Sequence, residues 1–286
     1  MQSHYFTYYL TEISEILAGH MTLQELIKQI CTPSVLAEKD QFLIKMADSG
    51  KEIEMAQRLR FEVFGLEQGK NLASAQQDQL DRDEFDEYCL HLIVVEKKSG
   101  LIVGTYRMHP GMAASSGIGF YSAREYHIEG LDKISENTIE VGRSCVSPEY
   151  RSGAVVALLW AGIAEVLKRS KMRYLLGCVS LETTEPAVGW ALYEHFKERN
   201  NLSAVLQATP TDDFVLPPPD AVKMRELLDS RRTLLHLIPP LFKGYLRLGV
   251  GICGAPALDK DFSSIDFLVL LDHASLPEKY FKHFCS

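Results

Sequence analysis

Two β-branched runs separated by a glycine-containing turn impose the strongest structural constraint in this sequence. CLHLIVVE (89–96) and LIVGTYRM (101–108) flank the turn KKSG, which predicts an antiparallel hairpin. Further strand patterns occur at 42–47, 138–146, 173–180 and 264–271, with helical patterns between them. A small-residue loop, HPGMAASSGIG (109–119), is expected after the hairpin. This order predicts an α/β fold in which a mixed central β-sheet is flanked by helices.

The helical patterns also predict how the chain is divided. Residues 1 to 40 contain two short helical patterns, near 8–18 and 22–31, and we expect them to form a helical N-terminal appendage. The main domain is then expected at 41–286, with a C-terminal extension after the proline-rich stretch LPPPD (216–220). The main predicted helices of this domain have apolar residues at helical spacing: 52–64, 154–169 and 187–199.

Composition excludes several classes of protein. The chain has 286 residues, 46% of them hydrophobic, so it can bury a sizeable core, and its net charge of −8 argues against a nucleic-acid partner. The six cysteines form no CxxC pair, which fits reduced cytosolic thiols and predicts no metal site. No uncharged apolar stretch approaches the ~20 residues needed to span a bilayer. We expect a cytoplasmic protein, with peripheral contact at the inner face of the membrane as the alternative.

The loop PEYRSG (148–153) opens directly into a predicted helix. Free backbone N–H groups and the positive end of the helix dipole make such a helix start an anion site. Arg151 adds positive charge there, and Gly153 lets the backbone approach an anion. An ordinary loop with a glycine before a helix is the alternative interpretation.

The strand pattern TIEVGRSCV (138–146) contains two charged residues, Glu140 and Arg143, in a segment otherwise suited to burial. Buried charges need partners or a function. A spacing of three places the two side chains on opposite faces of a regular strand, unless a bulge at Gly142 redirects one of them. A structural ion pair with the acidic loop 65–88 is the alternative.

Specific motifs occur in order along the chain: RLRFEVF, DRDEFD, CLHLIV, GTYRM, FYSAREY, EVGRSCVSPEYRSG, LLGCVS and PPLFKGYLRLG. In these motifs the chain resembles the bacterial N-acyltransferases that form lyso-ornithine lipid and related N-acyl amino acids, over roughly residues 50 to 285. Those enzymes are similar to acyl-homoserine-lactone synthases, relatives with the GNAT fold that take acyl chains from acyl carrier protein. The resemblance implies an enzyme that joins a long-chain acyl group, carried on acyl carrier protein, to the α-amine of an amino acid, most readily ornithine. It implies no tightly bound cofactor, because the acyl-phosphopantetheine is a co-substrate.

The resemblance also implies roles for individual residues. Arg60 and Phe64 match residues that shape the amine-substrate pocket of the synthases. Glu140 matches the usual candidate base and Arg143 the arginine of the same strand, and the resemblance implies that both are catalytic residues. The acidic loop pair and the hairpin arginine of the synthases are matched by Asp83, Asp86 and Arg107. The phosphopantetheine arm is expected at a loop without the double glycine of acetyl-CoA-binding members: Arg151, Ser152, Gly153 and Ala154.

The partner and the reaction leave alternatives open. Acyl carrier protein is acidic, so docking requires a local basic surface. The candidates bracket the helix after the phosphate loop: Arg151, Lys168, Arg169, Lys171 and Arg173. A solvated helix end is the alternative interpretation of 168–173. An acetyl-CoA-dependent GNAT acetyltransferase and a non-enzymatic lipid- or carrier-binding module are competing functions. We expect Cys145 and His91 to be structural, because an acyl-cysteine route needs a neighbouring base and no histidine is adjacent to the cysteine in sequence.

Overall fold

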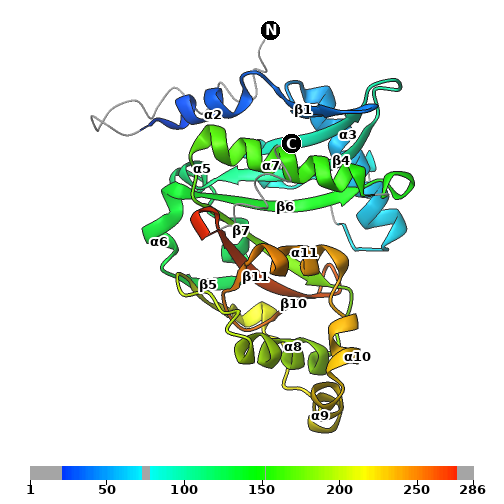
Figure 1. Cartoon of the computed structure of the whole chain (residues 1–286), viewed down its shortest axis with the longest axis vertical. Coiled ribbons are helices and arrows are strands. Elements are labelled where there is room, and N and C mark those ends of the chain that lie inside the picture. Colours follow the sequence, from blue (N-terminus) through cyan, green and yellow to red (C-terminus); the bar gives the residue numbers. More distant parts are fainter. Residues whose placement is uncertain (1–20, 73–77, 152, 276–286) are drawn as a thin grey trace. The chain divides into compact units, whose positions relative to one another are not determined.

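The computed structural model describes three stretches of the chain: 21–72, 78–151 and 153–275. They form two compact units (Figure 1). Among the described residues, unit 1 comprises 21–118 and 141–172, and unit 2 comprises 119–140 and 173–275. The predicted helix at 8–18 lies outside the described residues.

Unit 1 is an antiparallel sheet with helices on both faces. Its strands pair in the order β1 (Val35–Lys39), β2 (Phe42–Met46), β3 (Leu90–Glu96), β4 (Ile102–Pro110) and the later part of β6 (Thr138–Val146). Its helices are α2 (Leu23–Cys31), α3 (Gly50–Arg60), α5 (Gly111–Ser116) and α7 (Ala154–Ser170). A π-helical turn, Phe61–Glu67, extends α3, and a 3-10 turn covers Glu84–Glu87. The predicted hairpin is confirmed, since β3 pairs antiparallel with β4.

Alternation along β3 explains why both faces of this sheet are covered. Ile93 belongs to an apolar cluster with Leu59 of α3. Its neighbour Leu92 points to the other face and meets α7, where a Cβ added to Gly162 would lie 3.1 Å from it. The absent side chain at Gly162 therefore sets how closely α7 approaches the sheet.

Unit 2 is built around β7 and β11. Its strands are β5 (Tyr126–Glu129), β7 (Tyr174–Leu181), β8 (Gln207–Pro210), β9 (Gly251–Ile252), β10 (Ala257–Asp259) and β11 (Ser264–Asp272), together with residues 138–140 of β6. β11 pairs antiparallel with β7, β9 and β10, whereas β6 pairs parallel with β7, so the sheet is mixed. β5 and β8 form a separate two-stranded sheet. The helices are α6 (Leu131–Ile134), α8 (Pro186–Glu198), α9 (Ala221–Asp229), α10 (Arg231–His236) and α11 (Pro240–Leu248).

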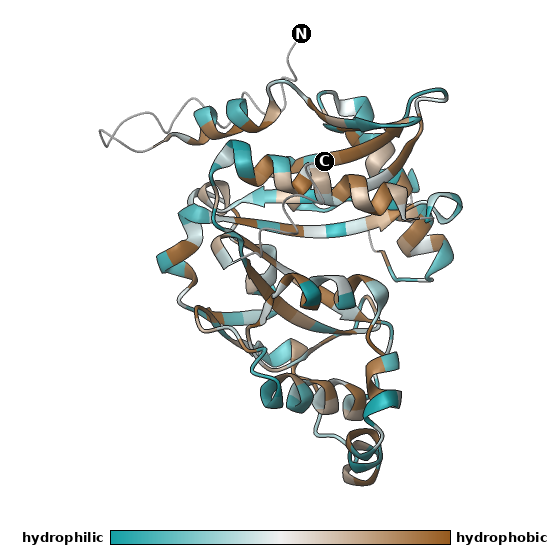
Figure 2. Ribbon diagram, in the orientation of Figure 1, coloured by the Kyte–Doolittle hydropathy of each residue, from teal (hydrophilic) through white to brown (hydrophobic). Residues whose placement is uncertain are grey.

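The core of unit 2 contains three aromatic rings from different elements. Phe196 of α8 lies with its ring centroid 5.5 Å from that of Phe267 on β11 and 5.5 Å from that of Phe242 on α11. All three side chains are fully buried. Figure 2 shows the hydrophobic character of β11, which is buried along nearly its whole length. These contacts hold α8 and α11 against the sheet.

The structure confirms the predicted fold class and adds elements that the patterns did not indicate, among them β1 and α5. Residues 35–39 form β1, which pairs with β2, so the helical part of the described N-terminal region ends at Cys31. The division at residue 40 stays a prediction. The small-residue segment after β4, expected as a loop, begins with the short helix α5.

Candidate active site

Arg60, the last residue of α3, lies at the centre of a buried ion-pair network in unit 1. Its Nε donates to Oδ2 of Asp81 at 2.9 Å, and its two terminal nitrogens donate to the two oxygens of Asp86 at 2.7 and 2.8 Å. The Arg60 side chain is only 1% exposed. Burial alone would raise the pKa of Asp86, but the hydrogen bonds and charge of Arg60 outweigh it and hold that pKa well below its usual range.

Two further arginines join this network from neighbouring strands. Arg107 of β4 donates from Nη1 to Oδ1 of Asp83 at 2.6 Å. Arg143 of β6 lies with Nε 3.3 Å from Oδ2 of Asp81 and Nη2 3.4 Å from Oδ2 of Asp83. The structure thus brings five predicted site residues together in one cluster, which we call the arginine–aspartate network: Arg60, Asp83, Asp86, Arg107 and Arg143, with Asp81 as a sixth member.

The motif DRDEFD (81–86) positions its own carboxylates. Asp83 caps the 3-10 turn by accepting from the backbone N–H of Phe85 at 2.9 Å, while Asp86 accepts from the backbone N–H of Asp83 at 2.9 Å. This reciprocal capping orients both acidic side chains through contacts within the motif itself, independently of the arginines. Sequence reasoning missed Asp81, although it opens the same motif and was therefore recognisable.

The strand β6 is irregular where Arg143 lies. Arg143 adopts φ +49°, in the left-handed region that side-chain-bearing residues rarely occupy. The sequence left open a bulge at Gly142 that would redirect one of the two charged side chains, and the structure has the irregularity one residue later, at Arg143. The alternative interpretation, ion pairing of Arg143 with the acidic loop, is also present in its contacts with Asp81 and Asp83.

Three neighbouring residues have packing roles. Burial lowers the pKa of His91 to about 4, so the ring is neutral near pH 7, and its Nε2 lies 3.3 Å from the carbonyl oxygen of Asp86. Burial raises the pKa of the Cys145 thiol to about 12, and this residue packs in the apolar cluster with Leu59. Both observations agree with the predicted structural roles. Phe64, on the π-helical turn, is half-buried and packs against the same cluster.

Glu140 is held by the segment that precedes β5 in unit 2. Its Oε2 accepts from the backbone N–H of Tyr121 at 2.7 Å, and its Oε1 accepts from the backbone N–H and the hydroxyl of Ser122 at 2.8 and 2.5 Å. The side chain is buried, at the point where β6 pairs with β7. Glu140 and Arg143 are therefore fixed by different sets of partners.

The predicted phosphate loop leads into α7 as expected. Gly153 adopts φ +98° immediately before Ala154, the first residue of α7. Space is open where a Cβ would lie at Gly153, so the backbone angle, not a steric clash, disfavours other residues there. Arg151 donates from both terminal nitrogens to Glu67 at 2.6 Å each. Ser152 lies outside the described residues.

The basic end of α7 is less open than the sequence indicated. Arg169 donates to the backbone carbonyl oxygens of Ile30 at 3.2 Å and Pro33 at 2.6 Å, and so ties α7 to the end of α2. Lys168 and Lys171 are exposed. Arg169 therefore has a structural function, and Lys168 and Lys171 are the candidates for carrier docking that remain at this end of α7.

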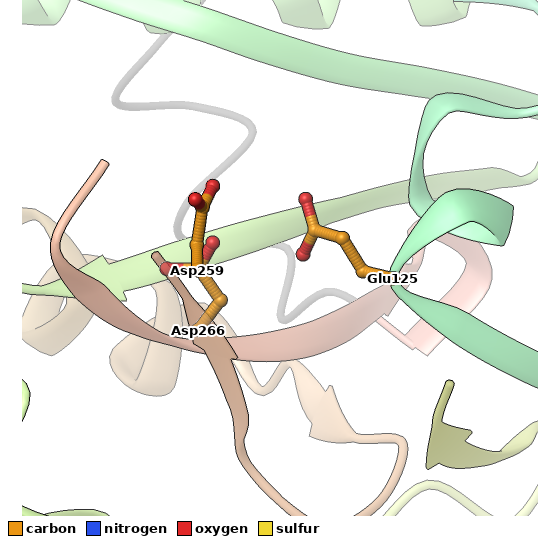
Figure 3. Close-up of side chains that lie close together, drawn as sticks. All are labelled: Glu125, Asp259 and Asp266. Carbon is orange, nitrogen blue, oxygen red and sulfur yellow. The ribbon is translucent and has the colours of Figure 1, made fainter. Parts of the chain in front are cut away.

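Unit 2 contains an acidic cluster that sequence reasoning missed: Glu125, Asp259 and Asp266. Figure 3 shows the three carboxyl groups turned toward one another, and their oxygens lie within 4.8 Å. Burial, reinforced by the charges of Asp266 and Asp259, raises the pKa of Glu125 well above its usual range. A charged residue inside the apolar strand pattern of 264–271 was the signal for Asp266. Carboxylates so placed hold protons or a cation.

Comparisons with known proteins show which family this chain resembles. Residues 59–161, which include the whole arginine–aspartate network, match the family described as "Acetyltransferase (GNAT) domain". The L-ornithine N(alpha)-acyltransferase of Brucella abortus is 34% identical over 84% of this chain and 88% of its own length. That of Agrobacterium fabrum is 34% identical over 84% of each chain.

A solved CoA-dependent acyl-homoserine lactone synthase, BjaI, is 15% identical, with a TM-score of 0.45 over 82% of this chain and 81% of that one.

Within the described residues, no helix has the length and apolar character needed to cross a membrane. The sequence relationship to the curated enzymes extends over most of both chains, well beyond the matched GNAT segment. The chain belongs to the L-ornithine Nα-acyltransferase family of GNAT-related acyltransferases.

Proposed function

We propose that this enzyme transfers a long-chain fatty acyl group from acyl carrier protein to the α-amine of L-ornithine. The product is an N-acyl ornithine of the lyso-ornithine-lipid type. One observation carries the proposal: relatives from four bacteria named L-ornithine N(alpha)-acyltransferase are 30–34% identical to this chain over 83–90% of its length. Ornithine and the carrier-bound donor are both part of the proposal.

Glu140 is our candidate general base. Only a neutral amine attacks a thioester carbonyl, so the site needs a proton acceptor near the amine nitrogen. The three hydrogen bonds to Glu140 hold its carboxylate in one orientation, as a base requires. The neutral amine nitrogen bonds to the acyl carbon, and its proton passes to Glu140 directly or through one water. The carbon–sulfur bond then breaks, the phosphopantetheine sulfur leaves with the electron pair as a thiolate, and it takes up the proton from Glu140 to become the free thiol. Backbone N–H groups of β6 are the proposed donors to the oxyanion.

The arginine–aspartate network forms the acceptor side of this proposed site. Its buried part, Arg60 with Asp81 and Asp86, is too enclosed to exchange partners easily and gives the acidic turn a rigid support. Arg107 fixes Asp83 on that turn. Phe64 is proposed to contribute to the amine pocket from the adjoining π-helical turn.

The start of α7 forms the donor side. Arg151, Ser152, Gly153 and Ala154 are proposed to bind the phosphate of the phosphopantetheine arm through backbone N–H groups and one guanidinium. Arg151→Ala and Gly153→Val are then expected to raise the KM for the acyl donor more than the KM for ornithine. Kinetics in which each substrate is varied separately distinguish this from a fault in the amine site.

The test of the whole proposal is a lipid extraction. Cells that express the protein are compared with cells that express the Glu140→Gln variant, and the extracts are analysed by mass spectrometry. A new N-acyl ornithine is the expected result, and another N-acyl amino acid would replace ornithine as the acceptor. Purified enzyme that prefers acetyl-CoA and acetylates a small amine or a protein would establish the competing acetyltransferase function. Absence of any acylated product, in cells or with purified donors, would favour a binding module.

A further inference from the structure

The segment that forms α10 and α11 differs in charge from the rest of the chain. Acidic residues make up 38 of the 286 residues, and the net charge is −8. Residues 230–258, which contain both helices, have no aspartate or glutamate but carry four lysines and arginines: Arg231, Arg232, Lys243 and Arg247. An acidic protein therefore has one segment whose formal charge is wholly positive.

Three of these four cations are not neutralised by the protein itself. Arg231 pairs with Glu198 of α8 at 3.1 Å, and both side chains are exposed. Arg232, Lys243 and Arg247 form no ion pair within the part of the chain that the structure describes. Their charge is thus available to an external anion.

The packing of α11 turns its two cations away from the core. Phe242 and Leu248 are buried, and the Phe242 ring belongs to the aromatic core of unit 2. Lys243 and Arg247 are four residues apart, so they lie on one face of the helix, opposite the two buried side chains. Gly244 lies beside them, and no atom comes within 4 Å of the place where its Cβ would be. The cationic face of α11 is therefore open.

An exposed leucine lies between the two helices. Leu237 follows α10 directly and is 42% exposed, although Leu234 and Ile238 close to it in sequence are buried. The surface thus combines unpaired cations with an accessible apolar side chain. This combination suits the boundary of an anionic lipid bilayer, where cations bind headgroup phosphates and apolar side chains reach the acyl chains.

We propose that the α10–α11 surface, defined by Arg232, Leu237, Lys243 and Arg247, docks on an anionic phospholipid bilayer. Its three cations bind lipid phosphates, and Leu237 enters the boundary between the headgroups and the acyl chains. The choice of a bilayer over another anionic partner rests in part on the proposed function, because an N-acyl ornithine is an amphiphile that partitions into lipid. Docking through this surface brings the enzyme to the phase that accepts its product.

Vesicle sedimentation of the purified enzyme tests the electrostatic part of the proposal. Wild-type enzyme should sediment with vesicles of phosphatidylglycerol and phosphatidylcholine, should be released by salt, and should remain in solution with phosphatidylcholine alone. Each lysine or arginine near an anionic surface strengthens binding about fivefold, so Lys243→Gln combined with Arg247→Gln should lower the partition coefficient about 25-fold. Lys51→Gln combined with Lys98→Gln removes two exposed lysines of unit 1 and is the matched control.

The apolar part of the proposal has its own variant. Leu237→Ser should lower the partition coefficient about three- to tenfold, since the part of this side chain that is exposed in solution no longer enters lipid. Leu101→Ser changes a leucine that is 53% exposed in unit 1, and it should sediment like wild type. Melting temperatures show that each variant is folded. If Lys243→Gln/Arg247→Gln fails to fold, the salt dependence and Leu237→Ser decide the outcome.

The proposal is wrong if wild-type enzyme sediments equally with both kinds of vesicle, or if Lys243→Gln/Arg247→Gln sediments like wild type. A higher KM for acyl carrier protein in that variant, with unchanged vesicle binding, would make this surface a carrier-docking site instead. Acylation of ornithine with soluble donors and no vesicles is measured separately and should not change in either variant. Wild-type enzyme that binds the anionic vesicles through this surface but forms no N-acyl ornithine would refute the proposed function and leave the docking surface intact.

Discussion

Both terminal nitrogens of Arg151 lie 2.6 Å from the two carboxylate oxygens of Glu67. The Nε of the same guanidinium donates to the carbonyl oxygen of Val146 at 3.1 Å. A guanidinium can bind an anion with two hydrogen bonds either through its two Nη atoms or through Nε and one Nη. In Arg151 all three nitrogens already donate hydrogen bonds, so both arrangements are occupied. A donor phosphate that engages Arg151 in this way has to displace Glu67.

We expect Glu67→Gln to strengthen binding of the acyl donor. The pair is half-exposed, and such pairs contribute about 0–1 kcal/mol, so the KM for the donor should fall by no more than about fivefold. The KM for ornithine should not change. The same substitution in an Arg151→Ala background should have no effect on the donor. A higher donor KM in Glu67→Gln would mean that Glu67 prepares Arg151 for the phosphate instead of competing with it.

Glu140→Gln should lower kcat about 10²- to 10⁴-fold if Glu140 is the base. The amide also has one acceptor oxygen where the carboxylate offers two, so one backbone N–H of Tyr121 or Ser122 loses its acceptor. We therefore expect a loss of about 1–3 kcal/mol in the free energy of unfolding as well.

Ser122→Ala is the matched control for that experiment, because it removes one hydrogen bond to Glu140 and leaves the carboxylate. It should reduce stability and keep most of the turnover. Turnover of Glu140→Gln within a few-fold of wild type, at a temperature where the variant is folded, would leave Glu140 as a structural clamp only.

The fold was predictable where a repeating pattern decides it. The alternation of 89–96 and 101–108 and the apolar periodicity of 154–169 depend on neighbours in sequence, and β3, β4 and α7 follow them closely. β1 was missed because VLAEK is short and contains two charged residues, so it has no clear strand pattern. Its strand conformation depends on pairing with β2. α5 was missed because glycine and serine are weak helix formers.

The sequence motifs identified most residues of the candidate site, but they did not reveal which of these residues contact one another. Arg60 and the acidic turn were identified by resemblance, but only the folded chain shows that Asp81 is the partner of Arg60 Nε. Glu125 and Asp266 are far apart in sequence, and no periodicity relates them. The function of Arg169 in fixing α2 is likewise a long-range contact, which a charge pattern at a helix end does not reveal.

The acidic cluster of unit 2 predicts a stability that falls as pH rises. The raised pKa of Glu125 means that folded protein keeps a proton that the unfolded chain loses above pH 4.5. From that pH up to the folded pKa, the free energy of unfolding should decline, by at most about 1.4 kcal/mol per pH unit for this one proton. Urea unfolding between pH 5 and 8, with EDTA to remove bound metal, measures it.

Glu125→Gln removes this proton and should make stability less dependent on pH, with a gain over wild type near pH 8. Glu129→Gln, an exposed change on β5, is the control and should follow wild type. Equal pH dependence in wild type and Glu125→Gln would contradict a protonated Glu125. If omitting EDTA restores wild-type stability at pH 8, the cluster binds a cation.

The choice of acyl donor can be tested at the exposed end of α7. Acyl carrier protein is acidic, so Lys168→Glu combined with Lys171→Glu should raise the KM for acyl carrier protein several-fold at low salt. Arg169 is left unchanged, because it holds α2 and its loss would confound docking with folding.

Salt should reproduce the effect of the lysine reversals in the wild-type enzyme, since exposed charges are screened over ~8 Å at physiological ionic strength. The KM for the matching acyl-CoA, which lacks the carrier protein, should change little with the double reversal, and that for ornithine not at all. Lys51→Glu combined with Lys98→Glu reverses two exposed lysines elsewhere in unit 1 and should not affect the carrier. The acetyltransferase function would be favoured if the enzyme prefers acetyl-CoA and if neither salt nor Lys168→Glu/Lys171→Glu changes the KM for acyl carrier protein. If salt raises the KM for acyl carrier protein but Lys168→Glu/Lys171→Glu does not, acyl carrier protein is still the donor. Its docking surface then lies elsewhere than at the end of α7.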